Sequence, residues 1–161
     1  MKNFSIKIGS REHWISRSMA VVGFIICVTR NTVYILANKR GNGTPDYQGL
    51  WNCPCGYLDY NETLKEGCAR EIYEETNFKI DPELLNLWSI NDDPKDSSRQ
   101  NVTFRFFAKV NDSALIQHIY AKGQEQDEVA DCMWINVNDI DKYEWAFNHK
   151  QLIKDLLCYF K

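Results

Sequence analysis

The sequence has no long polar, Pro/Ser-rich or low-complexity stretch that would separate domains, and it has no internal repeat. A chain of 161 residues is close to the usual size of one globular domain. Its hydrophobic residues, 44% of the total, are sufficient for a core, and its charged residues, 25%, are sufficient for solubility. We therefore expect residues 1–161 to form a single domain.

Long apolar runs are also missing. The longest, Met19–Val28, is much shorter than the roughly 20 residues that a membrane-spanning helix needs, and it is typical of a buried strand. Residues Met1–Trp14 lack the apolar segment of a secretion signal. These absences predict a cytoplasmic protein with no part in a membrane.

An excess of positive charge is absent as well, since the formal net charge is −3. Such a chain has no basic field that would hold extended nucleic acid by releasing its counterions. A small phosphorylated ligand remains compatible with this charge, because a bound cation can reverse the local sign of the field.

The six cysteines include one close pair, Cys53 and Cys55, but no second pair at ligand spacing. The pair by itself is weak support for zinc, which structural sites bind with four ligands. Without a secretion signal, the cysteines fit free thiols in a reducing cytosol better than a disulfide framework.

Runs rich in β-branched and aromatic residues predict strands, and helical periodicity predicts two helices. The expected strands are Phe4–Ile8 at an edge, Met19–Thr29, Thr32–Ala37, short strands within Gly49–Leu58, then Leu84–Ile90, Val102–Val110 and Val129–Val137. The expected helices are Leu64–Thr76 and Asn148–Tyr159. Strands before and after an internal helix indicate an α/β fold in which helices cover a mixed sheet.

The first helix has clear end signals. Thr63 and Glu66 form a capping-box pattern at its start, and no proline interrupts the helix. Asn77 is its expected end, because Asn tolerates the left-handed conformation second only to Gly.

A stripe of carboxylates runs along this helix. At about 100° per residue, Glu71, Glu74 and Glu75 crowd one side, next to a mostly apolar stripe. Like charges four residues apart repel each other, and a solvated charged face is the ordinary alternative. The crowding favours a cation at this position.

The spacing around the stripe is more specific. Gly56 is followed by Glu62, then by Arg70-Glu71-Ile72 and Glu74-Glu75, in the pattern G-x5-E-x7-R-E-U-x-E-E-x-G-U, where U is apolar. The segment Gly56–Phe78 therefore resembles the Nudix box. It departs at one fixed position, where Asn77 replaces the usual Gly, and this change affects the helix end rather than the chemistry.

The resemblance implies a Nudix-like α/β/α sandwich with a mixed sheet between helices. It also implies that Glu71, Glu74 and Glu75, with the Gly56 carbonyl, bind Mg²⁺ or alternatively Mn²⁺, ions that prefer such oxygen ligands. Arg70 would hold a carboxylate in place, although an ordinary ion pair with a neighbouring glutamate is its simpler role.

The family places its general base differently in different members. In this sequence the loop before the last predicted strand is acidic, with Glu128 as the first candidate and Glu125 as the second. Either residue could also be a solvated loop acid. We expect Glu74, Arg70 and Glu128 to be the catalytic residues.

Substrate contacts are expected outside the box. Arg17, Lys39 and Arg40 are candidates for phosphate oxygens, although cations at strand ends are often simply exposed. Trp51 is a candidate to stack on a base, although core or rim packing is the commoner role of such residues. Further aromatic candidates are Trp14, Tyr47 and Phe147. His149 lies in a segment similar to one near the C-terminus of ADP-ribose-type members.

These expectations predict a metal-dependent pyrophosphohydrolase that cleaves a nucleoside diphosphate linked to another moiety, with ADP-ribose or a nucleotide sugar favoured. The partner would be a small-molecule nucleotide, and the resemblance also favours a homodimer. Two alternatives stay open: a sensor domain that binds nucleotide without cutting it, and a nucleoside triphosphate or mRNA-cap hydrolase of the same family. The cap hydrolase is disfavoured by the acidic pI and the lack of a basic tract.

Overall fold

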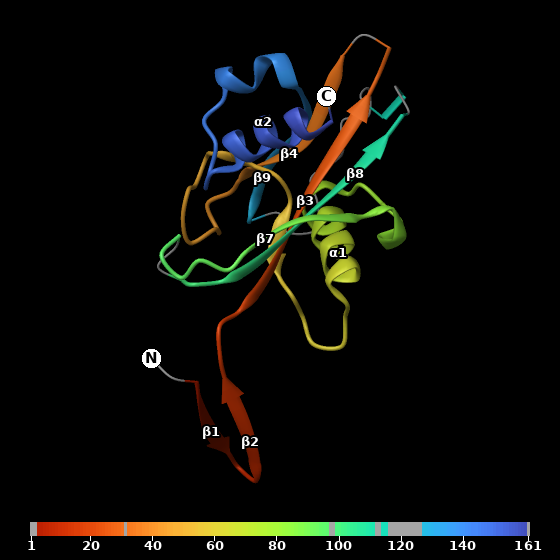
Figure 1. Ribbon diagram of the computed structural model, residues 1–161. Coiled ribbons are helices and arrows are strands. Elements are labelled where there is room, and N and C mark those ends of the chain that lie inside the picture. Colours follow the sequence, from red (N-terminus) through yellow and green to blue (C-terminus); the bar gives the residue numbers. More distant parts are fainter. Residues whose placement is uncertain (1–2, 31, 97–98, 112–113, 116–126, 161) are drawn as a thin grey trace.

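The computed structural model describes residues 3–30, 32–96, 99–111, 114–115 and 127–160. Within them a mixed sheet lies between two helices, so the predicted α/β/α sandwich is confirmed (Figure 1). The strands are β1 (Phe4–Ile8), β2 (Arg11–Ile15), β3 (Met19–Val28), β4 (Val33–Arg40), β5 (Trp51–Asn52), β6 (Cys55–Tyr57), β7 (Asn86–Asn91), β8 (Val102–Val110) and β9 (Val129–Asn136). The helices are α1 (Leu64–Thr76) and α2 (His149–Tyr159), with 3-10 turns η1 (Pro82–Leu84) and η3 (Val137–Lys142).

The main sheet combines both strand directions. Its order is β5-β4-β3-β8-β7, with β6 paired to β3 and β9 paired to β4. Strands β3 and β8 are parallel, whereas β3 and β4 are antiparallel. The central strand β3 is buried along most of its length, which explains its nearly continuous apolar sequence.

Each face of the sheet has its own hydrophobic core. On one face α1 contributes Cys68 and Ile72, which pack with residues such as Ile25 of β3. On the other face α2 contributes Ile153 and Leu156. The alternation of side chains along β3 therefore supplies both cores and fixes α1 against one side of the sheet.

Several boundaries differ from the predictions. Strand β4 continues to Arg40 because its end pairs with β5 and β9, so Lys39 and Arg40 lie in the strand rather than after it. A 3-10 turn at Pro82–Leu84 precedes β7, because Asp81 and Pro82 favour a turn there.

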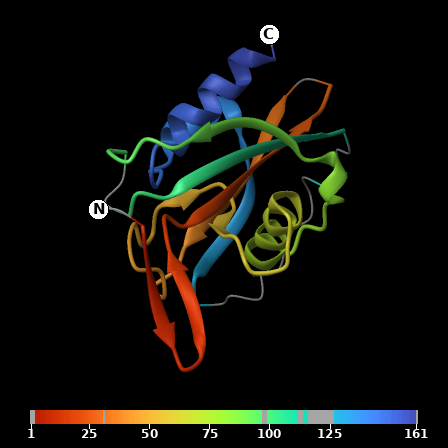
Figure 2. The same ribbon diagram turned by 60° about the horizontal axis from the view of Figure 1, so that its bottom comes forward.

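The N-terminal strand β1 does not join the main sheet as an edge strand. It pairs with β2, which the sequence analysis missed, in a separate two-stranded sheet. This hairpin projects from the body of the molecule (Figure 2), and most of its residues are exposed. At the base of the hairpin, Arg17 donates hydrogen bonds to the backbone carbonyls of Asp92 and Asn101 at 2.9 and 3.0 Å.

No helix in the described part of the chain is both long and apolar enough to cross a membrane.

Candidate functional site

Helix α1 starts and ends where its sequence predicts. The Thr63 hydroxyl accepts from the Glu66 N–H at 3.3 Å, and the Glu66 carboxylate accepts from the Thr63 N–H at 2.7 Å, so the capping box is confirmed. Asn77 ends the helix in the left-handed conformation, with φ 57°. These caps fix the register in which α1 presents its glutamates.

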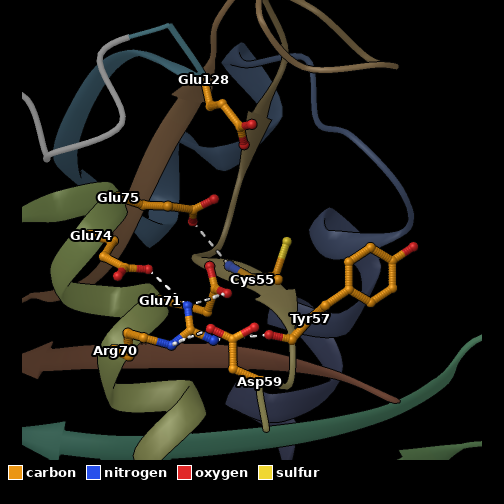
Figure 3. Close-up of a pocket in the computed structure, with 9 residues that line it drawn as sticks. Cys55, Tyr57, Asp59, Arg70, Glu71, Glu74, Glu75 and Glu128 are labelled. Carbon is orange, nitrogen blue, oxygen red and sulfur yellow. Dashed lines mark hydrogen bonds and ion pairs between the residues drawn. The ribbon is translucent and has the colours of Figure 1, made fainter. Parts of the chain in front are cut away.

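Arg70 organises the acidic side of α1 (Figure 3). Its Nη1 donates to Glu71 and Glu74, both at 2.8 Å. Its Nε and Nη2 donate to the two carboxylate oxygens of Glu62 at 3.0 and 2.8 Å. Nη2 also donates to the Tyr57 carbonyl at 2.9 Å, which ties the helix to β6. One guanidinium therefore positions three carboxylates and the strand that faces them.

The electrostatics follow from these contacts. Hydrogen bonds from Arg70 and from the Asp59 N–H, together with the charge of Arg70, lower the pKa of Glu62, while its slight burial acts in the opposite direction. The three partner carboxylates raise the pKa of Arg70 above its usual value. Glu62 is thus a permanently charged anchor for Arg70 at neutral pH.

Strand β6 approaches α1 very closely. The Cys55 N–H donates to the Glu75 carboxylate at 3.0 Å. A Cβ on Gly56 would lie 2.3 Å from the Glu71 carboxyl carbon, so any larger residue would force the Glu71 carboxylate or the strand to move. The Gly56 backbone therefore lies directly against the Glu71 carboxylate.

These residues line an open pocket of about 350 Å³. It brings together six predicted residues: Gly56, Arg70, Glu71, Glu74, Glu75 and Glu128. It also contains three that the sequence analysis did not select: Cys55, Tyr57 and Asp59. Cys55 and Tyr57 flank Gly56 in the chain, and this adjacency could have identified them.

The donor set of the pocket suits a hard divalent cation, because carboxylate oxygens are the ligands that Mg²⁺ and Mn²⁺ prefer. Among the described residues, however, no three acidic, cysteine or histidine side chains already stand at metal-binding positions. Arg70 holds Glu71 and Glu74 in ion pairs at 2.8 Å. Metal binding therefore requires rotations of these carboxylates that direct oxygens toward the ion, and each carboxylate can keep one oxygen on Arg70.

Three predicted substrate ligands have other contacts in the structure. Arg17 donates to backbone carbonyls at the base of the hairpin, and Arg40 forms an ion pair with Asp46 at 2.8 Å. Trp51 is buried in the core and contacts Tyr143 edge to face. A ring buried in this way offers no face to a nucleobase.

The remaining candidates are scattered. Lys39 is half-buried in β4, and Trp14 is 72% exposed on the hairpin. His149 is buried rather than presented to a ligand. Tyr47 and Phe147 lie against each other, with ring centroids 4.9 Å apart. Several further residues of the predicted base loop, including Glu125, lie outside the described residues.

Comparison with known proteins gives the family. A sequence model of the NUDIX domain matches residues 17–156, so the chain belongs to the NUDIX domain family. It is 27% identical over 123 residues to an ADP-ribose pyrophosphatase of Methanocaldococcus jannaschii, an alignment that covers 76% of this chain and 65% of that protein. The chain thus spans less than two thirds of the length of this relative.

Solved structures share the fold. The NUDIX domain of Shewanella oneidensis NrtR complexed with ADP ribose is similar with a TM-score of 0.75 at 20% identity, covering 91% of this chain and 90% of that one. A bifunctional NMN adenylyltransferase/ADP ribose pyrophosphatase from Francisella tularensis, complexed with AMP and a Mn ion, has a TM-score of 0.68 at 21% identity. That likeness covers 88% of this chain and 41% of the other.

Proposed function

We propose that this chain is a divalent-metal-dependent pyrophosphohydrolase that cleaves a nucleoside diphosphate linked to another moiety, with ADP-ribose or a nucleotide sugar as the favoured substrate. The observation that carries the proposal is the pocket in which Arg70 holds two of three helical glutamates opposite Gly56. The names of the relatives support the substrate class, since one is an ADP-ribose pyrophosphatase. Mg²⁺ is the proposed cofactor, with Mn²⁺ as the alternative.

In this proposal Glu71, Glu74 and Glu75 hold the metal, together with the Gly56 carbonyl. When bound, a divalent cation supplies positive charge that neutralises substrate phosphates and makes water more acidic. Arg70 is a positioning residue, because its contacts in the structure are to carboxylates and to a backbone carbonyl. It sets the direction in which Glu71 and Glu74 face the pocket.

Glu128 is the proposed general base. It lines the pocket from the segment before β9, while the glutamates enter from α1 (Figure 3). A carboxylate in this position can accept a proton from the water that attacks the phosphoanhydride. The Gly41 N–H donates to the Glu128 carbonyl at 2.6 Å, which fixes the backbone from which this side chain extends.

The test is turnover of a panel of ADP-ribose and nucleotide sugars with Mg²⁺. We expect two phosphorylated products, and we expect Glu74→Gln to lower kcat about 100-fold or more. Glu66→Gln is the matched control, because Gln preserves the capping box on the same helix and should leave the rate within about twofold. Absence of turnover with every substrate, or full activity of Glu74→Gln, would refute the proposal.

The sensor alternative predicts a different result when the same protein and substrates are used. A domain that binds nucleotide without cutting it would show calorimetric binding of ADP-ribose but no products. Formation of products by the wild type would exclude the sensor. Glu128→Gln should then abolish turnover and preserve the binding of ADP-ribose.

We also propose that the chain forms a homodimer through its N-terminal hairpin. A two-stranded hairpin is at best marginally stable alone in water, and this one exposes apolar side chains. They are Phe4, Ile6, Ile8, Trp14 and Ile15. The edge strand β7 offers an apolar surface for the hairpin, because it exposes Leu87 and Ile90. The acidic residues Asp92 and Asp93 follow this strand, and they are opposite in charge to Lys7 and Arg11 of the hairpin.

Light scattering after gel filtration tests the dimer. We expect the wild type to have twice the mass of one chain and the Ile6→Lys/Trp14→Lys variant to have the mass of one. Tyr159→Lys, which changes an exposed aromatic residue at the end of α2, should leave the mass unchanged. A monomeric wild type would rule the dimer out.

A further inference from the structure

Two aromatic residues outside the glutamate pocket share an unusual backbone conformation. Tyr47 has φ 53° and Phe147 has φ 56°, in the left-handed region that large side chains rarely adopt. Their rings lie 4.9 Å apart, and the side chains are 47% and 42% exposed. The fold therefore places two strained aromatic residues at the surface rather than in either core.

Polar contacts hold the first of these residues in place. Asp46, the neighbour of Tyr47, accepts from Arg40 and from Arg99, both at 2.8 Å. The Asp46 carbonyl also accepts from Arg40 Nε at 3.0 Å, and the Leu50 N–H donates to the Tyr47 carbonyl at 3.2 Å. Strained residues persist where their surroundings over-determine them, and such places are often functional.

Phe147 is held by ring contacts. The Arg40 guanidinium carbon lies 5.1 Å from the centre of its ring, and the His149 ring lies at 5.2 Å. Tyr47 and Phe147 come from segments far apart in the sequence, one after β4 and one before α2, which run side by side in Figures 1 and 2. Ring surface is still exposed on both residues.

The aromatic pair is connected to the glutamate pocket through β4. The Arg40 guanidinium carbon lies 5.1 Å from the centre of the Phe147 ring. The next residue, Gly41, is hydrogen-bonded to Glu128 of the pocket. A ligand with its phosphates at the glutamates can therefore extend past Arg40 toward the two rings.

We infer that Tyr47 and Phe147 form a stacking platform for the nucleobase of the substrate, an inference that rests on the proposed function. A base is the occupant that the chemistry favours, because aromatic rings stack on flat π-systems and every base has one. The charged groups beside the aromatic pair already form ion pairs with each other, since Asp46 is paired with Arg40 and Arg99. The platform would select substrates that carry a base over those that have only a sugar and phosphates.

Substitution by asparagine tests the platform without disturbing the loop. Asn accepts a positive φ better than Tyr does, so Tyr47→Asn and Phe147→Asn remove the ring and keep the backbone. We expect each to raise KM for ADP-ribose about tenfold, with kcat little changed. For phosphoribosyl pyrophosphate, which has a phosphoanhydride and no base, kcat/KM should stay within about twofold of the wild-type value.

A purely structural role for the rings gives other results. Thermal unfolding of both variants should occur at or above the wild-type temperature, whereas structural rings would lower it. Tyr159→Asn is the control for loss of an exposed aromatic residue and should leave both substrates unaffected. Equal loss with both substrates, or no change with ADP-ribose, would overturn the inference.

Binding of AMP separates this inference from the proposed function. In NMR titrations of the metal-free chain, we expect ring-current shifts of the AMP base protons and about tenfold weaker binding to Tyr47→Asn. If the wild type cleaves nothing but binds AMP in this way, the proposed function fails and the platform stands. If AMP does not bind, or binds Tyr47→Asn as tightly as the wild type, the platform fails. If Tyr47→Asn then has the mass of one chain while the wild type has the mass of two, the rings belong to a protein interface.

Discussion

The backbone N–H of Cys53 donates a hydrogen bond of 3.1 Å to Nδ1 of His149. This bond joins the segment between β5 and β6 to the first residue of α2, and the imidazole is 4% exposed. Burial, with the charges of Arg105 and Arg40, lowers the pKa of His149 to about 3. The ring is therefore neutral at physiological pH and acts as a hydrogen-bond acceptor in the core.

Acid should destabilise the fold through this residue. His149 has a pKa near 6.5 in the unfolded chain and about 3 in the folded one, so between these values the unfolded state binds more protons. The free energy of unfolding should then fall as pH drops from about 6.5 toward 3, by several kcal/mol at most, on the order of 1.4 kcal/mol per pH unit.

The check is urea denaturation from pH 7.5 to 4. Replacing His149 by Gln retains an acceptor but removes the titration, so the variant should lose less stability on acidification than the wild type. Equal pH dependence of the two proteins would show that His149 does not contribute.

Arg70 should not be replaceable by lysine. Its planar fork reaches Glu62, Glu71 and Glu74 at once, whereas an ammonium group on a flexible stem cannot match this geometry. We expect Arg70→Lys to lower kcat and to raise the Mg²⁺ concentration needed for half-maximal rate. The combined effect on activity should be about 10- to 100-fold. Lys65→Ala, on the same helix, should have little effect, and an Arg70→Lys enzyme with wild-type metal dependence would contradict a positioning role.

The closeness of β6 to α1 gives a second prediction for activity. An Ala at position 56 would place its Cβ 2.3 Å from the Glu71 carboxyl carbon, so the strand or the glutamate has to move. A shift of about 1 Å in such a site is sufficient to reduce turnover about 100-fold. Steady-state kinetics of Gly56→Ala, with circular dichroism to verify folding, test this expectation, and a folded variant with unchanged kcat would oppose it.

The end of α1 offers a change in stability without a change in chemistry. Asn77 occupies the left-handed C-cap at φ 57°, where Gly has no steric cost. We expect Asn77→Gly to raise the free energy of unfolding by about 0.5–1 kcal/mol and Asn77→Ala to lower it by about 1 kcal/mol. Both should retain wild-type kcat in the turnover assay, and a large loss of activity in the glycine variant would indicate a role for the Asn side chain.

Where an element depends on local sequence, its first and last residues could be predicted correctly. Helix α1 is an example, because its capping box and its stop at Asn77 lie within a few residues of the backbone that they cap. The hairpin partner β2 was missed, since Arg11–Ile15 has little apolar character and its pairing with β1 contributes to neither core. The contacts of Arg17 with the Asp92 and Asn101 carbonyls could not be predicted, because these residues lie far from Arg17 in the sequence.

The sequence by itself determined that Glu71, Glu74 and Glu75 share one side of a helix, because helical periodicity is set by nearest neighbours along the chain. Only the tertiary structure decided that Gly56 meets Glu71, that Glu128 faces the same pocket, and that Arg40 is paired with Asp46 beside Phe147. These contacts join segments far apart in the chain. They depend on how the strands of the sheet pair and how the helices pack on its faces, which no local pattern specifies.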